Sequence, residues 1–182
     1  TDIYTLSLHD ALPSLRYIRQ FDNVWLEDIR ATEAELAGAA DRVSAPLKSA
    51  IAQASRNIEK FHRTQLEAPQ VIETMPGVRC WRKAVAIERV GLYIPDGTAP
   101  LFSTILLLAI PARLAGCREI VLCTPPGANG EIHSAVLYAA AVSGITRVYK
   151  VGGVQAIAAM AYGTATVPAV DKIFGPGNQY VT

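Results

Sequence analysis

Four turns rich in proline or glycine are the places where this chain could bind a ligand. They are Pro95-Asp96-Gly97, Pro125-Pro126-Gly127, Gly152-Gly153 and Gly175-Pro176-Gly177-Asn178. Each follows a short apolar stretch that is typical of a β-strand. Glycines in such turns leave backbone amides free to bind phosphate or another anion. The first turn lacks the G-x-G-x-x-G spacing, so the standard Rossmann fingerprint is missing.

Histidines and cysteines, which most often bind metals, form no recognisable site. His9, His62 and His133 are far apart and lack the spacing of metal ligands. We expect His62 on the polar face of a helix and His133 on the surface. The three cysteines include no C-x-x-C pair and are odd in number, so we expect buried or half-buried thiols in a reducing cytosol. They are Cys80, Cys117 and Cys123.

The second half of the chain contains the elements that would position the turns. Predicted strands cover residues 90–94, 119–124, 147–151 and 172–174. Predicted helices cover residues 101–115, 132–143 and 154–162, each ended by a glycine. This alternation predicts a parallel sheet with right-handed crossovers. The four turns then lie at the carboxyl edge of the sheet, where open α/β sheets bind ligands.

The first half predicts helices followed by a hairpin. A helix is possible over residues 11–21, and Thr32 with Glu35 forms a capping box for a helix over 34–42. Ser44 begins a longer helix with Pro46 in its first turn. Its apolar stripe is expected in the core: Leu47, Ile51, Ala54, Ile58, Phe61 and Gln65. Residues 71–75 and 78–82 predict a hairpin around Pro76-Gly77, and 84–90 continues with strand-like alternation.

Composition excludes several classes of protein. Of 182 residues, 51% are hydrophobic and 18% are charged, which excludes global disorder. The net charge of +1 and the absence of a basic run argue against nucleic-acid binding. The apolar stretch 100–115 is interrupted by polar residues and is too short for a membrane span, so we expect a buried helix. The segment after Thr1 lacks the pattern of a signal peptide, and a cytoplasmic protein is expected.

Four ordered blocks closely resemble histidinol dehydrogenase. They are Val90-Gly91-Leu92-Tyr93-Ile94-Pro95, Ala99-Pro100-Leu101-Phe102-Ser103-Thr104, Val151-Gly152-Gly153 with Gln155-Ala156-Ile157-Ala158, and Asp171-Lys172-Ile173-Phe174-Gly175-Pro176-Gly177-Asn178. The resemblance begins near Leu15. It implies a Rossmann-like parallel sheet with helices on both faces, preceded by a helical and hairpin segment. It also implies a zinc-dependent homodimer that oxidises L-histidinol to L-histidine through the aldehyde, with two hydride transfers to NAD.

The family's NAD-contacting residues correspond to Tyr93, Gln155 and Asn178 in this chain. Tyr93 ends a predicted strand, where an aromatic face and a hydroxyl could meet an adenosine or a ribose. Gln155 lies in the first turn of a helix, and its amide both donates and accepts. From local pattern alone, each also has a structural role: Tyr93 closing the sheet edge, Gln155 capping a helix and Asn178 bonding within its own turn.

Two features depart from the family pattern. Asp96 stands where the family usually has glycine, and its carboxylate would repel a pyrophosphate at that turn. Residues 1–12 match nothing in the family pattern and resemble translated adapter sequence, so their deletion is expected to leave stability unchanged. The expected organisation is this leader, a helical and hairpin segment over 13–89, and an incomplete NAD-binding domain over 90–182.

The family's catalytic groups are expected outside this chain. The resemblance implies zinc ligands and a Glu-His pair beyond Thr182, so no catalytic residue or zinc ligand is assigned within these residues, and the chain alone is expected to be inactive. Two alternatives remain: a related enzyme acting on another polar alcohol, such as a sulfonated diol, or an NAD-binding module without catalysis. Activity on histidinol and an NAD titration would discriminate them.

Overall fold

The computed structural model describes residues 15–95 and 100–176. Its body is a four-stranded parallel sheet in the order β5-β4-β3-β6. The strands are β3 (Arg89–Tyr93), β4 (Glu119–Thr124), β5 (Arg147–Lys150) and β6 (Lys172–Phe174). When these four strands are renumbered 1 to 4 along the chain, their order in the sheet is 3-2-1-4, which is the strand order of the first part of a doubly wound fold. The predicted Rossmann-like parallel sheet is confirmed.

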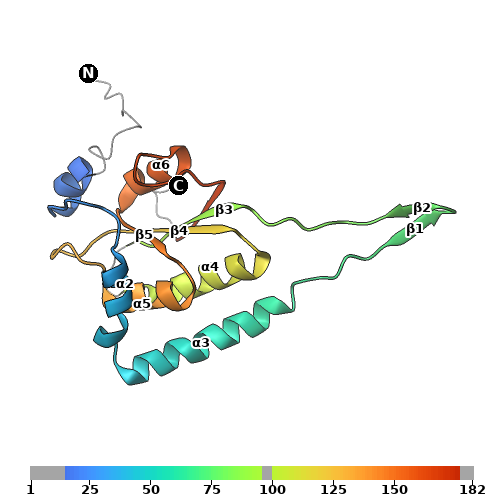
Figure 1. Ribbon diagram of the computed structural model, residues 1–182, viewed down its shortest axis with the longest axis horizontal. Coiled ribbons are helices and arrows are strands. Elements are labelled where there is room, and N and C mark those ends of the chain that lie inside the picture. Colours follow the sequence, from blue (N-terminus) through green and yellow to red (C-terminus); the bar gives the residue numbers. More distant parts are fainter. Residues whose placement is uncertain (1–14, 96–99, 177–182) are drawn as a thin grey trace, which may run out of the picture.

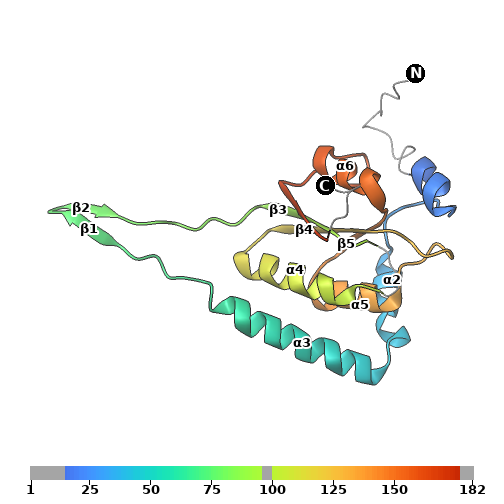
Figure 2. The same ribbon diagram turned by 180° about the vertical axis from the view of Figure 1, so that it is seen from behind.

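Helices cover both faces of the sheet, as predicted. α4 (Phe102–Ala115) and α5 (Ser134–Val142) cover one face, and α6 (Gly153–Tyr162) covers the other (Figures 1 and 2). The long α3 (Ala45–Arg63) packs against α4 on the side away from the sheet. Successive side chains of β4 point to opposite faces of the sheet and so contribute to two apolar cores. Leu122 packs with α4 and α5, while Val121 and Cys123 pack with α6. Each face of the sheet therefore has its own apolar layer.

Glycines end the helices as the sequence predicts. Gly116 follows α4 with φ +86°, and its amide donates to carbonyls of the last turn. Gly144 and Gly163 lie at the ends of α5 and α6 with φ +82° and +79°. A left-handed residue at these positions strongly favours glycine, so the chain leaves each helix at a fixed point.

The N-terminal segment covers the outer edge of β5. After a π-helical turn (η1, Ile18–Asp22), the chain runs antiparallel to β5, with Arg30 bridging Tyr149. The Lys150 amide donates to the Ile29 carbonyl at 2.6 Å, and the Ala31 amide donates to the Val148 carbonyl at 2.9 Å. These bonds satisfy an edge that would otherwise expose unpaired backbone groups.

The predicted capping box forms. The Thr32 side chain accepts from the Glu35 amide at 3.1 Å, while the Glu35 carboxylate accepts from the Thr32 amide at 2.7 Å. The helix it begins, α2 (Glu33–Gly38), is shorter than the predicted 34–42, and a 3₁₀ turn (η2, Ala40–Arg42) follows. Ser44 precedes α3 with Pro46 in the first turn, but its side chain makes no capping bond.

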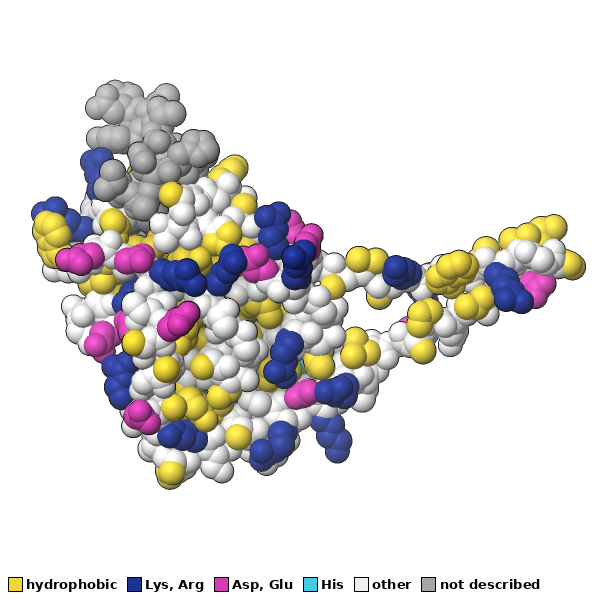
Figure 3. Space-filling model, in the orientation of Figure 1, with side chains coloured by type: hydrophobic (Ala, Val, Ile, Leu, Met, Phe, Trp, Pro, Cys, Tyr) yellow, Lys and Arg dark blue, Asp and Glu magenta, His cyan; other side chains and the backbone are white. Residues whose placement is uncertain are grey.

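A hairpin arm projects from the body. β1 (Ile72–Met75) and β2 (Val78–Cys80) pair antiparallel, as predicted, and extend well beyond α3 (Figures 1 and 3). We define the arm as residues 67–85, all of which are exposed. Its apolar side chains therefore lie at the surface of the described chain, where Figure 3 shows them in yellow.

Three predictions about the first half are wrong. Cys80 is exposed, because it lies on the arm rather than in the body. The stripe of α3 leaves the core toward the helix end, where Phe61 is 64% exposed and Gln65 is also exposed. Residues 84–88 are not a strand, because they have no ladder partner in the described part of the chain; β3 begins at Arg89.

Candidate functional site

The sheet changes winding direction between β3 and β6. The chain leaves β3 into α4 on one face and reaches β6 from α6 on the other (Figure 1). Ligands of open α/β sheets bind beside the carboxyl ends of the strands at such a switch point. Tyr93 ends β3 and Gly175 follows β6, so both residues lie at this place.

Tyr93 is almost completely buried. The residue is 4% exposed, and its ring belongs to the apolar core on the α6 face. The hydroxyl oxygen accepts a hydrogen bond from the Gly153 amide at 3.0 Å. The ring face is therefore engaged in the core rather than offered to an adenosine, and the hydroxyl is the part that could meet a ligand.

Gln155 lies beside this hydrogen bond. It is half-buried in the first turn of α6. Gly153 has φ +65°, and a Cβ built there would lie 2.8 Å from Gln155 Oε1. The side-chain amide of Gln155 thus occupies the space beside Gly153. The structure brings Tyr93 and Gln155 together through one glycine, 60 residues after Tyr93 in the chain.

Two other glycines allow close approach of the turns at this edge. A Cβ at Gly175 would collide with the carbonyl oxygen of Tyr93, and a Cβ at Gly152 would lie 2.6 Å from the Cβ of Pro125. Real Cβ atoms do not approach so closely, so a side chain at either position would push the turns apart. The glycines predicted to serve anion binding thus also have a packing role.

Asn178 and Asp96 lie outside the described residues. The contribution of Asn178 to NAD binding and the repulsion expected from Asp96 therefore remain predictions.

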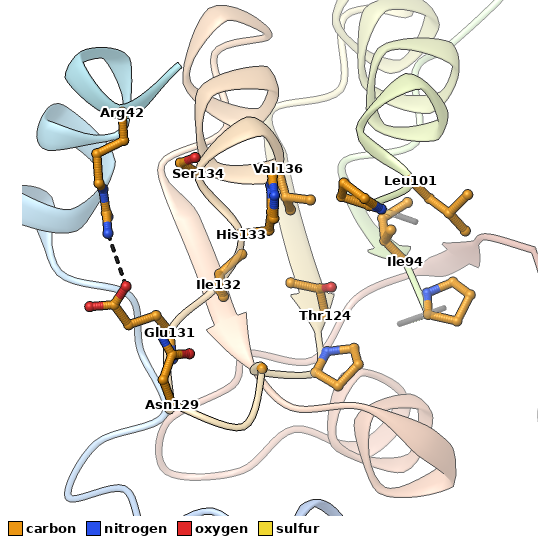
Figure 4. A pocket seen from close by; sticks show the side chains of 14 residues that line it. Arg42, Ile94, Leu101, Thr124, Asn129, Glu131, Ile132, His133, Ser134 and Val136 are labelled. Carbon is orange, nitrogen blue, oxygen red and sulfur yellow. Dashed lines mark hydrogen bonds and ion pairs between the residues drawn. The ribbon is translucent and has the colours of Figure 1, made fainter. Parts of the chain in front are cut away.

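A hollow of about 460 Å³ lies at the same edge, on the face of α4 and α5 (Figure 4). Ile94 and Pro95, which follow Tyr93, line one side, and Thr124 at the end of β4 lines another. Arg42 points across to Glu131, and their ion pair of 2.9 Å bounds the hollow (Figure 4). This hollow was not predicted from the sequence, although the Pro125-Pro126-Gly127 turn is a local signal for it.

His133 has a defined structural role at the rim of this hollow. It is exposed, as expected, and precedes α5 as the N-cap. Its Nδ1 accepts from the Ala135 amide at 3.2 Å. The first turn of α5 is therefore already capped by the protein itself.

A buried lysine anchors the end of β5 next to the Gly152-Gly153 turn. Lys150 is 8% exposed, and its Nζ donates to Glu35 Oε1 at 2.6 Å. Partial burial of Glu35 acts to raise the pKa of its carboxyl, but the hydrogen bonds from Lys150 and Thr32 outweigh burial and lower that pKa. One carboxylate thus caps α2 and neutralises the buried ammonium. This pair was not predicted from the sequence.

The described residues contain no cluster of three or more side chains able to hold a metal ion. His62, near the end of α3, interacts with Phe61 and with Gln65, which follows the helix. His9 lies outside the described residues. Cys123 is fully buried, and burial raises the pKa of its thiol, so it is unreactive. Within the same residues, no helix is both long and apolar enough to cross a membrane.

Comparison with known proteins identifies the relatives of this chain. The family model described as "Histidinol dehydrogenase" matches residues 9–182, and so includes residues 9–12 of the leader. The chain is 61% identical over 168 residues to the histidinol dehydrogenase of Bacteroides thetaiotaomicron, covering 92% of this chain and 39% of that protein. It is 56% identical over 163 residues to that of Xylella fastidiosa, covering 90% and 38%.

The fold of the chain is also that of a solved relative. The crystal structure of histidinol dehydrogenase from Elizabethkingia anophelis matches with a TM-score of 0.92 and 53% identity, over 94% of this chain and 40% of that one. The chain thus spans about two fifths of the length of the relatives it matches. On the match of the family model to nearly its whole length, the chain belongs to the histidinol dehydrogenase family.

Proposed function

We propose that this chain forms the NAD-binding part of a histidinol dehydrogenase, an enzyme of histidine biosynthesis. The whole enzyme would oxidise L-histidinol to L-histidinaldehyde and then to L-histidine. The first oxidation transfers a hydride to NAD⁺ and releases one proton. The second transfers a hydride to another NAD⁺ and releases two protons, one of them from ionisation of the carboxylic acid. Two NAD molecules are consumed per histidine, and a water supplies the second carboxylate oxygen.

The arrangement at the switch point supports NAD as the ligand. The Tyr93 hydroxyl and the Gln155 amide both lie against Gly153 at the carboxyl edge of the sheet, near the point where the winding reverses. Both groups donate and accept hydrogen bonds, as recognition of ribose hydroxyls and phosphate oxygens requires. Asn178 would complete the set. The hollow of about 460 Å³ beside Pro95 has a volume within the range for small-molecule sites, but it lies on the α4–α5 face of this edge and is lined by neither Tyr93 nor Gln155.

The described residues do not fit the zinc site of the family. They include no cluster of ligands for the ion, so no step of the chemistry is assigned to them through zinc. When bound, zinc would lower the pKa of the alcohol and orient it. In the proposed enzyme, the ligands and the Glu-His pair belong to sequence C-terminal to this chain, which alone would be inactive.

We further propose a homodimer in the cytoplasm. All three cysteines of the chain are free, which fits a reducing compartment. The homodimer is carried over from the family, and the proposal for residues 90–182 as the NAD-binding unit follows from the placement of Tyr93 and Gln155 within them.

The test is a calorimetric titration of NAD into the chain. We expect saturable binding, weakened about fivefold by Tyr93→Phe, because one neutral hydrogen bond is worth about 1 kcal/mol. Tyr138→Phe is the matched control, because it removes a hydroxyl from α5 and leaves the switch point untouched. Absence of saturable binding by the unaltered chain would overturn the proposed NAD site.

A further inference from the structure

Gly153 touches both side chains of the proposed dinucleotide site. Its amide donates to the Tyr93 hydroxyl at 3.0 Å. Its missing side chain leaves the space that the Gln155 amide fills, with Oε1, Cδ and Nε2 at 2.8, 3.3 and 3.3 Å from where a Cβ would stand. One glycine therefore holds a hydroxyl on its nitrogen side and accommodates an amide on its α-carbon side.

We propose that Gly153 is a positioning residue for the dinucleotide: its amide fixes the Tyr93 hydroxyl as a hydrogen-bond donor, and its bare α-carbon leaves the space that the Gln155 amide occupies. This inference rests on the proposed NAD site and adds the residue that couples its two contacts.

The hydrogen bond from Gly153 determines whether the Tyr93 hydroxyl donates or accepts toward a ligand. A tyrosine oxygen that accepts a bond from an amide keeps its own proton to donate. The ring is buried in the α6-face core, so the oxygen stays at one place and only the proton rotates. The donating amide belongs to the first residue of α6, where the positive end of the helix dipole strengthens its hydrogen bond to the phenol oxygen. The hydroxyl therefore suits a ribose or phosphate oxygen of the dinucleotide.

The backbone of Gly153 sets the place of Gln155. At φ +65° an L-residue with a side chain is strained. Its Cβ would also displace the Gln155 amide from its position against Gly153. Replacing Gly153 by alanine would therefore disturb the ligand contacts, whereas replacing a glycine of similar φ elsewhere in the chain would introduce strain alone.

The experiment compares Gly153→Ala with Gly144→Ala in calorimetric NAD titrations of the whole chain. Gly144 has φ +82° and open space where a Cβ would stand, so its variant carries the strain without touching the site. We expect Gly153→Ala to weaken NAD binding about tenfold, and Gly144→Ala to keep it within about twofold. Equal affinities for the two variants would overturn the inference and leave the NAD site standing.

A double-mutant cycle with Tyr93→Phe and Gln155→Ala tests the coupling of the two contacts even if Gly153→Ala does not fold. If Gly153 couples the two contacts, the second substitution costs less once the first has been made, and the combined loss is smaller than the product of the single losses. Independent, multiplicative losses would overturn the inference. No NAD binding by the unaltered chain would overturn the proposed function and the inference with it.

Discussion

The sheet body and the hairpin arm use similar apolar residues with opposite results. Leu92 and Leu122 in the body are at most 1% exposed, whereas Ile72 and Trp81 in the arm are each 60% exposed. Both regions have paired strands, but the body's central strands have neighbours on both sides and helices on both faces. The arm has one pair of strands and no covering layer in the described residues. Burial here follows from layering rather than from composition.

The arm depends on its own turn for order. Gly77 has φ +81°, and its amide donates to Glu73 Oε1 at 2.9 Å. A two-stranded hairpin is marginally stable in water, because few apolar contacts offset the loss of chain entropy. We therefore expect substitutions in the body and in the arm to have different effects on stability.

The largest contrast concerns core packing. Leu122→Ala is expected to lower the free energy of unfolding by about 2–5 kcal/mol, because it leaves a cavity between the sheet and the α4–α5 layer. Ile72→Ala in the arm is expected to change it by less than about 0.5 kcal/mol. Urea denaturation followed by circular dichroism measures both. A large loss from Ile72→Ala would show that the arm shares the stability of the body.

A middle-sized contrast concerns charge. At pH 7, Glu35→Gln is expected to cost about 1–3 kcal/mol, because Lys150 loses its anionic partner while still buried. The folded pKa of Glu35 lies below its ordinary value of 4.5, so the stabilisation is present above pH 4.5 and is lost as pH falls through the folded pKa. Denaturation curves of both proteins should converge in acid.

The matched control for this charge is Glu88, which follows the arm and pairs with Arg118. Their side chains are 62% and 82% exposed, so solvent screens the pair. Glu88→Gln is expected to change stability by at most about 1 kcal/mol. A pH-independent difference between Glu35→Gln and the unaltered chain would contradict the assigned role of the Glu35 carboxylate.

The smallest effect is expected from Gly77→Ala. The substitution strains the arm's turn by about 1–2 kcal/mol, but the arm opens without the body, so global unfolding should not change. Backbone amides of β1 and β2 should exchange hydrogen faster. Gly116→Ala at the end of α4 is the counterpart in the body, with φ +86°, and there the same strain should appear in global stability. Equal global losses would break the distinction between the two regions.

Local signals predicted the body of the fold well. The bounds of β4 and β6 agree with the predicted 119–124 and 172–174, because turn residues flank short apolar runs there. The edge pairing of Arg30 with Tyr149 was not predictable, since no local pattern in residues 29–31 reveals a partner far along the chain. The exposed position of Cys80 was missed for a related reason: the hairpin pattern was clear, but its lack of a covering layer was not.

The site was predictable by residue but not by contact. Tyr93 and Gln155 were proposed from the family resemblance, and the structure places them together. Neither the Gly153–Tyr93 hydrogen bond nor the Lys150–Glu35 pair could be read from the sequence. Both join residues widely separated along the chain, and they form only after the crossovers bring the strand ends to one edge.

The strand-like segment at residues 29–31 also constrains the order of folding. During synthesis it leaves the ribosome well before β5, to which it pairs, so that edge of the sheet can close only after residues 147–150 have been made. Contacts between such distant residues carry a large loop-closure entropy and slow folding. Residues 29–31 are made first and must therefore wait for a partner that is made late, so their backbone groups remain unpaired and open to other chains until then.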